Sequence, residues 1–409
     1  MRVLLITPVF HPEPYYLRGL PFAQGLIERG FEVEVLTGFP SYPVGRIYPG
    51  YRQRFWYRET HGGVRIIRVP SFPSHDSSGL RRAVTYLSLA ASMALAGPFL
   101  VKQPDIVHVN QGPATLCLPA ECLRLLRGSP ILLDIQDLWP ESVMDSNMLR
   151  CRWAPPVLHL WSRHTYRRAN HILALSPGVK GVLVSRGVPE SKVTVLLNWC
   201  AKELESSLPP RECCEDVHGL ADTFNVVYAG NMGPLQALHT VLRAATRLRA
   251  THPDVRFVLV GGGLEEASLR ERAETEGLDN VRFVQRQPIE QLNRILAFAS
   301  AVLVHLRDSA LNRVGIPSKL QHGMAIGRPV LIGARGSAAE LVQQAGAGIA
   351  FEPENAEALA DAVETLADMP RAEREAMGLR GREYYVKNMA FEVGMDKLAR
   401  LYRRVASAR

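Results

Sequence analysis

The sequence predicts an α/β protein built from two doubly wound domains. Three observations carry this prediction. Strand-like and helix-like segments alternate in two successive series, a polar break with two prolines separates the series near residues 199–222, and 409 residues suit two or three domains. Hydrophobic residues make up 47% and charged residues 22% of the chain, which excludes a disordered or collagen-like protein.

The first series begins with RVLLITPVF, whose continuous apolar run is typical of a parallel strand covered on both faces. A helix is expected over LPFAQGLIERG, which Gly30 ends. Helices separate several of the further strands expected in this half, which are FEVEVLTGF, VRIIRVPSF, PDIVHVN, SPILLDIQD, ANHILALS and VTVLLNW.

The second series begins again with a strand and a glycine turn, FNVVYAGNMG. Helices are expected between its further strands, which are VRFVLVGGG, NVRFVQ, AVLVHLR, RPVLIG and AGIAFEP. We therefore expect one domain over 1–199, a second over 200–380, and a separate C-terminal helix over 381–409.

The positive charge is confined to one half of the chain. Residues 1–200 hold 22 Lys and Arg against 13 Asp and Glu, a net +9, whereas residues 201–409 hold 26 against 27, a net −1. This asymmetry favours an anionic partner for the first half, with an Arg-rich composition and no partner as the alternative. No zinc, helix-turn-helix or RNA-binding signature accompanies it, so nucleic acid is not expected.

One segment departs from the soluble pattern. Residues 83–101 are 19 uncharged residues, which is close to the length that spans a membrane. This segment has three possible interpretations: a helix buried in the domain, a helix at the membrane interface, or a membrane-spanning helix. A membrane-spanning helix would interrupt the predicted sheet. The stretch 150–170 mixes Trp153 and Trp161 with arginines, a composition that suits a lipid headgroup boundary.

The six cysteines form no CxxC pair and have no histidine at zinc spacing, so neither a disulfide framework nor a metal site is expected. The N-terminal apolar run is too short for a signal peptide. We expect a cytoplasmic protein.

Candidate ligand-binding residues follow the strands, because open α/β sheets bind ligands beyond the carboxyl ends of their strands. In the second half the glycine turn holds Gly230, Asn231 and Gly233, and a later loop brings together Arg307, Arg313 and Lys319. Three cations between a strand and a helix could neutralise a pyrophosphate, and a solvated basic loop is the alternative.

In the first half, polar residues follow the first and the fifth expected strands. Asp137 and Glu141 are candidates for acid–base chemistry, with helix capping as the alternative for Glu141. The other candidates on this side are Glu13, Tyr15, Arg18 and Gln136.

Several of these motifs together resemble the retaining glycosyltransferases of family 4 with the GT-B fold. RDSALNRVGIPSKLQHGMAIGRPVLIG and DIQDLWPES are similar to segments of the branch that makes O-antigen or colanic acid and includes fucosamine transferases. GNMG and LLNW resemble that branch's glycine loop and interdomain segment, and the resemblance covers nearly the whole chain.

The resemblance implies two Rossmann-like domains that face a central cleft, with the C-terminal helix returning to the first domain. It implies that the second domain binds a nucleotide-diphosphate sugar, with UDP as the expected nucleotide, and that the first binds the acceptor. It implies Asp137, Lys319 and Arg313 as catalytic residues and no metal or cofactor. The donor-binding residues would be Gly230, Asn231, Gly233, Arg286, Arg307, Ser318, Lys319 and His322. The acceptor side would hold Glu13, Tyr15, Arg18, Gln136 and Glu141.

The sequence departs from the family at two acidic positions. The family's Glu-x7-Glu motif falls on Val314 and His322 here, so the carboxylate that usually holds the ribose hydroxyls is replaced by an imidazole. Gln136 stands where the wider family has its active-site histidine.

The expected activity is therefore transfer of a sugar, with retention and without a metal, to a lipid-linked or polysaccharide acceptor in cell-envelope glycan synthesis, such as that of lipopolysaccharide or exopolysaccharide. A nucleotide-sugar 2-epimerase and a non-catalytic binding protein on the same fold are the alternatives. The expected partners are the nucleotide sugar, the acceptor and a membrane surface at the inner face of the plasma membrane, touched by the first domain.

Overall fold

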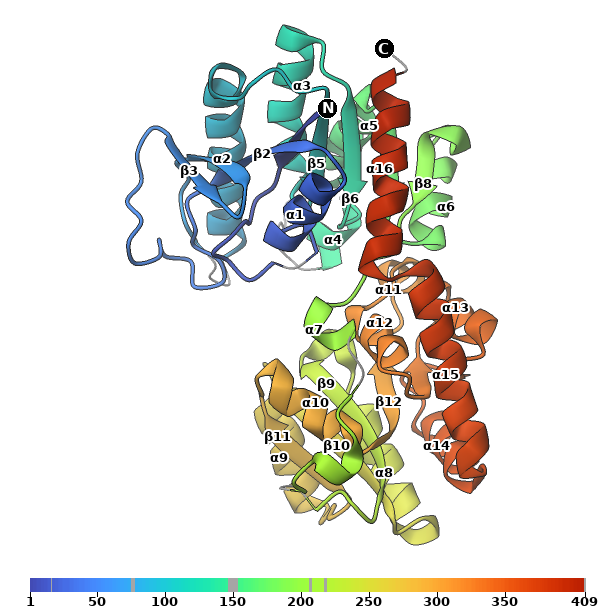
Figure 1. The fold of residues 1–409 in the computed structure, drawn as a ribbon. Coiled ribbons are helices and arrows are strands. Elements are labelled where there is room, and N and C mark those ends of the chain that lie inside the picture. The colour runs from blue at the N-terminus through green and yellow to red at the C-terminus, as the bar shows by residue number, and fades with distance from the viewer. Residues whose placement is uncertain (16, 75–77, 146–153, 206–207, 217–218, 408–409) are drawn as a thin grey trace. The chain divides into compact units, whose positions relative to one another are not determined.

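The computed structural model describes residues 1–15, 17–74, 78–145, 154–205, 208–216 and 219–407. The chain divides into two compact units (Figure 1). Unit 1 contains Met1–Leu197 and Gly394–Arg409, and unit 2 contains Asn198–Val393.

Unit 1 is built on an eight-stranded sheet in the order β3-β4-β2-β1-β5-β6-β7-β8. The strands are β1 (Arg2–Ile6), β2 (Glu32–Gly38), β3 (Tyr57–His61), β4 (Val64–Val69), β5 (Ile106–Gln111), β6 (Ile131–Ile135), β7 (His171–Ala174) and β8 (Val193–Val195). All neighbours pair in parallel except β3 and β4, which are antiparallel. The seven parallel strands were predicted; β3 was not, because its sequence YRETH is polar and largely exposed at the sheet edge.

Helices connect the strands of unit 1 in the doubly wound manner. They are α1 (Leu20–Glu28), α2 (Gly79–Leu100), α3 (Cys117–Arg127), α4 (Glu141–Asp145), α5 (Ala154–Arg168), α6 (Pro177–Ser185) and α16 (Phe391–Ser407), with single turns η1 (Ala114–Leu116) and η2 (Glu190–Lys192). Ser78 caps α2 by accepting a hydrogen bond from the Arg81 N–H, and Gly128 ends α3 in the left-handed conformation.

Unit 2 is built on a six-stranded, fully parallel sheet in the order β11-β10-β9-β12-β13-β14. Its strands are β9 (Phe224–Asn231), β10 (Val255–Gly262), β11 (Val281–Gln285), β12 (Ala299–His305), β13 (Val330–Gly333) and β14 (Gly348–Phe351). Its helices are α7 (Lys202–Glu205), α8 (His239–Thr251), α9 (Glu266–Thr275), α10 (Ile289–Ala297), α11 (Ala310–Val314), α12 (Ser318–Ala325), α13 (Ser337–Ala345), α14 (Ala356–Asp368) and α15 (Arg371–Asn388), with turns η3 (Arg211–Cys213) and η4 (Pro234–Gln236). The predicted class of two doubly wound α/β domains is confirmed.

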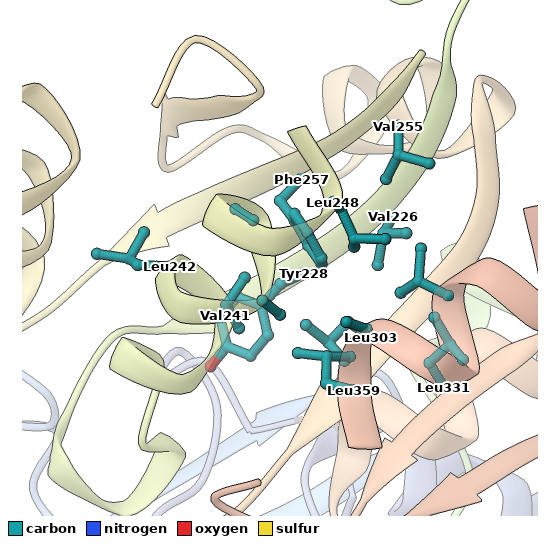
Figure 2. Close-up of a cluster of buried hydrophobic side chains, with 14 of the residues drawn as sticks. Val226, Tyr228, Val241, Leu242, Leu248, Val255, Phe257, Leu303, Leu331 and Leu359 are labelled. Atoms are coloured by element: carbon teal, nitrogen blue, oxygen red, sulfur yellow. The ribbon is translucent and has the colours of Figure 1, made fainter. Parts of the chain in front are cut away.

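The core of unit 2 lies on both faces of this sheet. Alternate residues of a strand point to opposite faces, so Val226 and Tyr228 pack under α8 and α14 while Val227 packs toward α10. Figure 2 shows the first of these clusters, in which the Tyr228 ring lies among aliphatic side chains and its hydroxyl points away from them. The same tyrosine therefore belongs to the core and reaches the carboxyl end of β9.

The C-terminal helix returns to unit 1, as expected, but it begins later than the sequence analysis placed it. The boundary expected at residue 381 falls inside α15, which stays with unit 2. α15 packs closely on its own unit. At Gly378 the helix lies so near the Gly327 carbonyl that any side chain there would collide with it, so glycine permits this close approach. The chain enters unit 1 again at Gly394, within α16.

The uncharged segment forms most of α2, which packs on one side against β2, β4 and α3. Within the described residues it is the one helix long and apolar enough to cross a membrane by length and composition, and 28% of its most apolar window is buried. Part of the Trp- and Arg-rich stretch, including Arg150, Arg152 and Trp153, lies outside the described residues.

Candidate active site

Two glycine turns meet at the carboxyl edge of the sheet in unit 2. Gly230 at the end of β9 pairs in register with Gly261 of β10. Both have positive φ values, 148° and 141°, which side chains rarely adopt. A side chain on Gly261 would also collide with the Gly230 carbonyl oxygen. The two turns therefore present bare backbone at this edge.

Lys319 lies directly over the first of these turns. It is the second residue of α12, and its ammonium lies 5.0 Å from the centre of the Tyr228 ring. A Cβ atom on Gly230 would lie 2.5 Å from Lys319 Cε, so only glycine leaves room for this side chain. Burial lowers the pKa of Lys319 to about 8, and no carboxylate among the described residues forms an ion pair with it. The result is a half-buried cation whose charge no carboxylate among the described residues neutralises.

His322 lies one helical turn after Lys319. Burial, and then the charge of Lys319, lower its pKa to about 4, so the ring is neutral at neutral pH. Its Nε2 atom is buried and has no hydrogen-bond partner among the described residues. An imidazole nitrogen thus remains available to a ligand at the position where the resemblance implies a ribose contact.

The remaining residues of the glycine loop are held by one another. Gln236 accepts hydrogen bonds through Oε1 from Asn231 Nδ2 at 3.2 Å and from the Gly233 N–H at 3.1 Å. The Tyr228 hydroxyl donates to the Asn231 carbonyl. The loop is therefore fixed from the core side before any ligand arrives.

The expected cluster of three loop cations is not what the structure contains. Arg313 makes two hydrogen bonds to Asp308, both of 2.7 Å, and of this pair Arg313 is exposed and Asp308 partly buried. Asp308 lies five residues before Arg313, so α11 brings the two together and the charge of Arg313 is already neutralised. Arg286, Arg307 and Ser318 are exposed. Of the predicted cations, Lys319 is the one that is half-buried, and it forms no ion pair within the described parts of the chain.

In unit 1 the corresponding edge of the sheet carries Asp137. It follows β6, and its N–H donates to the Gln111 carbonyl at 3.3 Å, while its carboxylate faces Gly112. The side chain is open to solvent, yet desolvation by the protein around it raises its pKa to about 6. A carboxyl group with this pKa is ionised at neutral pH and can still take up a proton.

Behind Asp137 lies a buried charged cluster that the sequence analysis did not predict as a unit. Asp134 forms a buried ion pair with Arg18 and accepts a 2.7 Å hydrogen bond from Gln136 Nε2. Its third contact is His108 Nε2, at 3.1 Å. Burial alone would raise the pKa of Asp134, but Arg18 and His108 outweigh it and hold that pKa well below its usual range.

Several predicted acceptor-side residues are used within the protein instead. The Glu13 carboxylate accepts hydrogen bonds from the N–H groups of Phe10, Ser41 and Tyr42 at 3.0, 2.8 and 2.7 Å, so it joins two loops. Glu141 pairs with Arg186.

Arg18 is fully buried, so it positions Asp134 rather than facing a ligand. Tyr15 accepts a 3.1 Å hydrogen bond from Asn110, and burial raises its pKa to about 12, which makes it a neutral group. For Glu13, Glu141 and Arg18 the structure thus gives a supporting role in place of acceptor binding.

The sequence analysis missed Tyr228 and His108. Both residues lie inside strand-like runs, where the sequence pattern predicts core side chains. The position of Tyr228, only two residues before the glycine turn, could have indicated that it lies near the site. Among the described residues, no group of three or more His, Cys, Asp or Glu side chains could hold a metal ion.

Comparison with known protein families gives a match in each half of the chain. Residues 20–199 match the model described as "Glycosyl transferase 4-like domain". Residues 216–384 match "Glycosyl transferases group 1". Together these matches cover most of both units.

Individual relatives agree with these matches. The chain is 27% identical over 397 residues to WcaI of Escherichia coli K12, a protein named for a glycosyl transferase role in colanic acid biosynthesis, and the match covers 91% of this chain and 93% of that one. A trehalose 6-phosphate synthase from Burkholderia multivorans superposes with a TM-score of 0.73 at 15% identity, covering 100% of this chain and 97% of the other. Anabaena HepE, solved with UDP and glucose, superposes with a TM-score of 0.69 at 14% identity, covering 98% and 99%.

Proposed function

The chain is a glycosyltransferase with the GT-B fold, and we propose that it moves a sugar from a nucleotide-diphosphate donor to a lipid-linked or polysaccharide acceptor, with retention of anomeric configuration. The acceptor belongs to cell-envelope glycan synthesis, by analogy with the colanic acid role named for the E. coli relative. The observation that carries this proposal is the half-buried Lys319 above the bare backbone of Gly230, which pairs with no carboxylate among the described residues.

The donor half-site is the carboxyl edge of the sheet in unit 2. The diphosphate contacts Lys319, the N–H groups of the glycine turns and the first turn of α12, where the helix presents unpaired N–H groups around Ser318. His322 supplies its unpartnered Nε2 to a ribose hydroxyl. UDP is the proposed nucleotide, since the structurally similar HepE was solved with UDP.

The proposed catalysis depends on stabilising the negative charge that develops on the diphosphate leaving group. As the bond between the anomeric carbon and the diphosphate oxygen breaks and the acceptor oxygen bonds to that carbon, negative charge grows on the diphosphate, which takes up the proton that the acceptor hydroxyl loses. An ammonium that is already desolvated and in place stabilises that charge without reorganisation. No metal takes part in this proposal, because Lys319 and the backbone N–H groups act on the leaving group.

The acceptor half-site is the carboxyl edge of the sheet in unit 1. Asp137 accepts a hydrogen bond from the acceptor hydroxyl and orients its oxygen. Gln136, its neighbour in the chain, is held by Asp134 of the buried cluster. Unit 1 works at the cytoplasmic face of the plasma membrane, where a lipid-linked acceptor is held.

A donor screen tests this function. Purified protein is incubated with UDP-, GDP- or dTDP-sugars and a membrane lipid extract, and the products are analysed. Transfer of sugar to lipid supports the proposal, and Lys319→Ala should abolish it while the exposed Lys387→Ala does not. A converted sugar with donor alone would indicate a 2-epimerase instead. No binding or turnover of any donor would indicate a binding protein and overturn the proposal.

A further inference from the structure

The outer face of α2 carries a continuous apolar stripe. Its residues recur every three to four positions, which places them on one side of the helix. The large exposed members are Leu80 (74%), Val84 (40%), Leu87 (60%), Leu95 (76%) and Phe99 (81%), and the exposed Ala91 stands between Leu87 and Leu95. At 1.5 Å per residue the 22 residues of α2 extend about 33 Å. A surface helix of a soluble protein would place polar residues on this side.

The stripe continues onto the neighbouring helices of unit 1. On α3, Leu118, Leu125 and Leu126 are exposed to 40, 73 and 66%, and on α5 the exposed residues are Val157 and Leu160 at 53 and 71%. The three helices are neighbours: α2 packs against α3 (Figure 1). Arg168 of α5 bonds Glu121 of α3 at 3.0 Å. We call these exposed residues of α2, α3 and α5 the apolar face.

The charged side chains of these three helices are almost all positive. The three helices contain seven arginines and one carboxylate, Glu121, which is 8% exposed and paired with Arg168. The arginines are Arg81, Arg82, Arg124, Arg127, Arg163, Arg167 and Arg168. An apolar surface on helices that carry seven arginines, and whose one carboxylate among the described residues is already paired, complements the anionic headgroups of a bilayer.

The opposite face of α2 is fastened to the sheet. Leu89, Met93 and Gly97 are buried, and a side chain on Gly97 would lie 2.9 Å from Leu36. Arg58 donates a 2.9 Å hydrogen bond to the Leu100 carbonyl at the end of the helix. A spanning helix would have to lose these contacts. The helix therefore lies in its place in unit 1, with only the stripe available.

We propose that the apolar face docks unit 1 onto an anionic lipid bilayer, with α2 lying parallel to the membrane plane and its outer stripe in the headgroup–acyl boundary. This inference deepens the proposed function, on which it rests for its purpose, because a lipid-linked acceptor is held in that bilayer. The docking itself needs neither donor nor transfer, so it is measured separately.

Vesicle flotation with the full chain tests the proposal. The protein should float with vesicles rich in phosphatidylglycerol, should bind pure phosphatidylcholine vesicles at least tenfold more weakly, and should dissociate at about 0.5 M salt, where surface charges are screened. The double variant Leu95→Glu, Phe99→Glu should reduce binding to phosphatidylglycerol at least tenfold. Leu264→Glu and Leu379→Glu, at residues 90 and 56% exposed in unit 2, are matched controls that should leave it unchanged.

The arginines are tested independently of the apolar stripe. Arg163→Gln with Arg167→Gln, both exposed on α5, should weaken binding by about fivefold per charge and make it less sensitive to salt. Calorimetric titration with UDP should give the same affinity for the wild type and all these variants. UDP binding without vesicle binding would overturn the docking surface alone, whereas vesicle binding without donor turnover would overturn the proposed function alone.

Three other outcomes also overturn the docking mode. Protein that stays with the vesicles after an alkaline carbonate wash would indicate a span. Equal binding by the Leu95→Glu, Phe99→Glu variant would place the lipid contact elsewhere. A dimer that this variant dissociates, in a protein that binds no vesicles, would assign the apolar face to a second copy of the chain.

Discussion

The hydroxyl of Tyr402 on α16 lies 2.6 Å from Nδ1 of His108 on β5. Burial lowers the pKa of His108, and its other nitrogen, Nε2, faces the ionised Asp134, so the ring is neutral with its proton on Nε2. Nδ1 then accepts a hydrogen bond that Tyr402 donates. The C-terminal helix is thereby joined to the cluster that holds Gln136.

Removing this hydroxyl should destabilise the protein measurably. Tyr402→Phe leaves Nδ1 of His108 buried and unpaired, which costs about 1–3 kcal/mol of the free energy of unfolding. Urea denaturation followed by circular dichroism gives this value. Tyr384→Phe, on the half-buried side of α15, serves as the control and should change it by only a few tenths. Equal stability of Tyr402→Phe and wild type would contradict the assigned hydrogen bond.

Donor binding should weaken in alkaline solution because of Lys319. Its pKa of about 8 means that the ammonium of the free protein loses its proton above pH 8. A bound diphosphate would raise the pKa of Lys319 and keep it protonated. Affinity for UDP should therefore be constant between pH 7 and about 8 and then fall by up to tenfold per pH unit. Isothermal calorimetry across this range makes the measurement.

Two variants separate this effect from general damage at high pH. Lys319→Ala should weaken UDP binding by about 1–3 kcal/mol at pH 7 and remove the alkaline loss. Lys319→Arg keeps its charge throughout, so any remaining affinity should not vary above pH 8. An alkaline loss that persists in both variants would assign it to another group.

Transfer activity should decline in mild acid because of Asp137. With a pKa raised to about 6, the carboxylate becomes protonated below pH 6 and can no longer accept a hydrogen bond from the acceptor. The logarithm of kcat/KM should fall with a slope of 1 below that pH. Asp137→Asn should lose at least tenfold in activity and show no acidic limb.

The Asp137→Asn variant should be at least as stable to unfolding as the wild type. The surroundings of Asp137 disfavour its charge, so replacing the carboxylate by an amide should keep or raise the free energy of unfolding at pH 7. A variant that loses stability along with activity would indicate a structural role. Glu13→Gln offers the contrast, since its carboxylate accepts three backbone hydrogen bonds and its replacement should destabilise the loops.

Gly230→Ala should displace Lys319. The new methyl group would meet Lys319 Cε at 2.5 Å and would also require a φ of 148°. We expect UDP affinity to fall at least tenfold. Gly277→Ala also replaces a glycine of positive φ, but its nearest neighbour would be 3.9 Å away, so it should cost about 1 kcal/mol of stability and leave UDP binding unchanged. Similar UDP affinities in the two variants would contradict the role given to Gly230.

The parallel strands were predictable because burial on both faces leaves continuous apolar runs in the sequence. The glycine turn and Lys319 were predictable because they follow directly from those strands. Contacts between distant residues were not. Glu13 is satisfied by backbone groups 28 and 29 residues away, and Tyr402 is 294 residues from His108. No local pattern shows that such carboxylates and rings are already engaged.

Arg313 was misjudged for a different reason. Its partner Asp308 is only five residues away, but residue type and spacing alone do not tell whether two opposite charges face each other or both face a ligand. The distinction depends on the path of the backbone through α11. Lys319 differs from Arg313 because it points back over β9, where no acid among the described residues pairs with it.

The return of α16 to unit 1 has a consequence for synthesis on the ribosome. The 196 residues from 198 to 393 are translated between the two parts of unit 1, which takes roughly 10–40 s at about 5–20 residues per second. During that interval His108 lacks Tyr402, and the surface that receives Met395 and Leu398 is uncovered. Unit 2 can therefore complete its fold while the nascent unit 1, although synthesised first, still awaits its last helix.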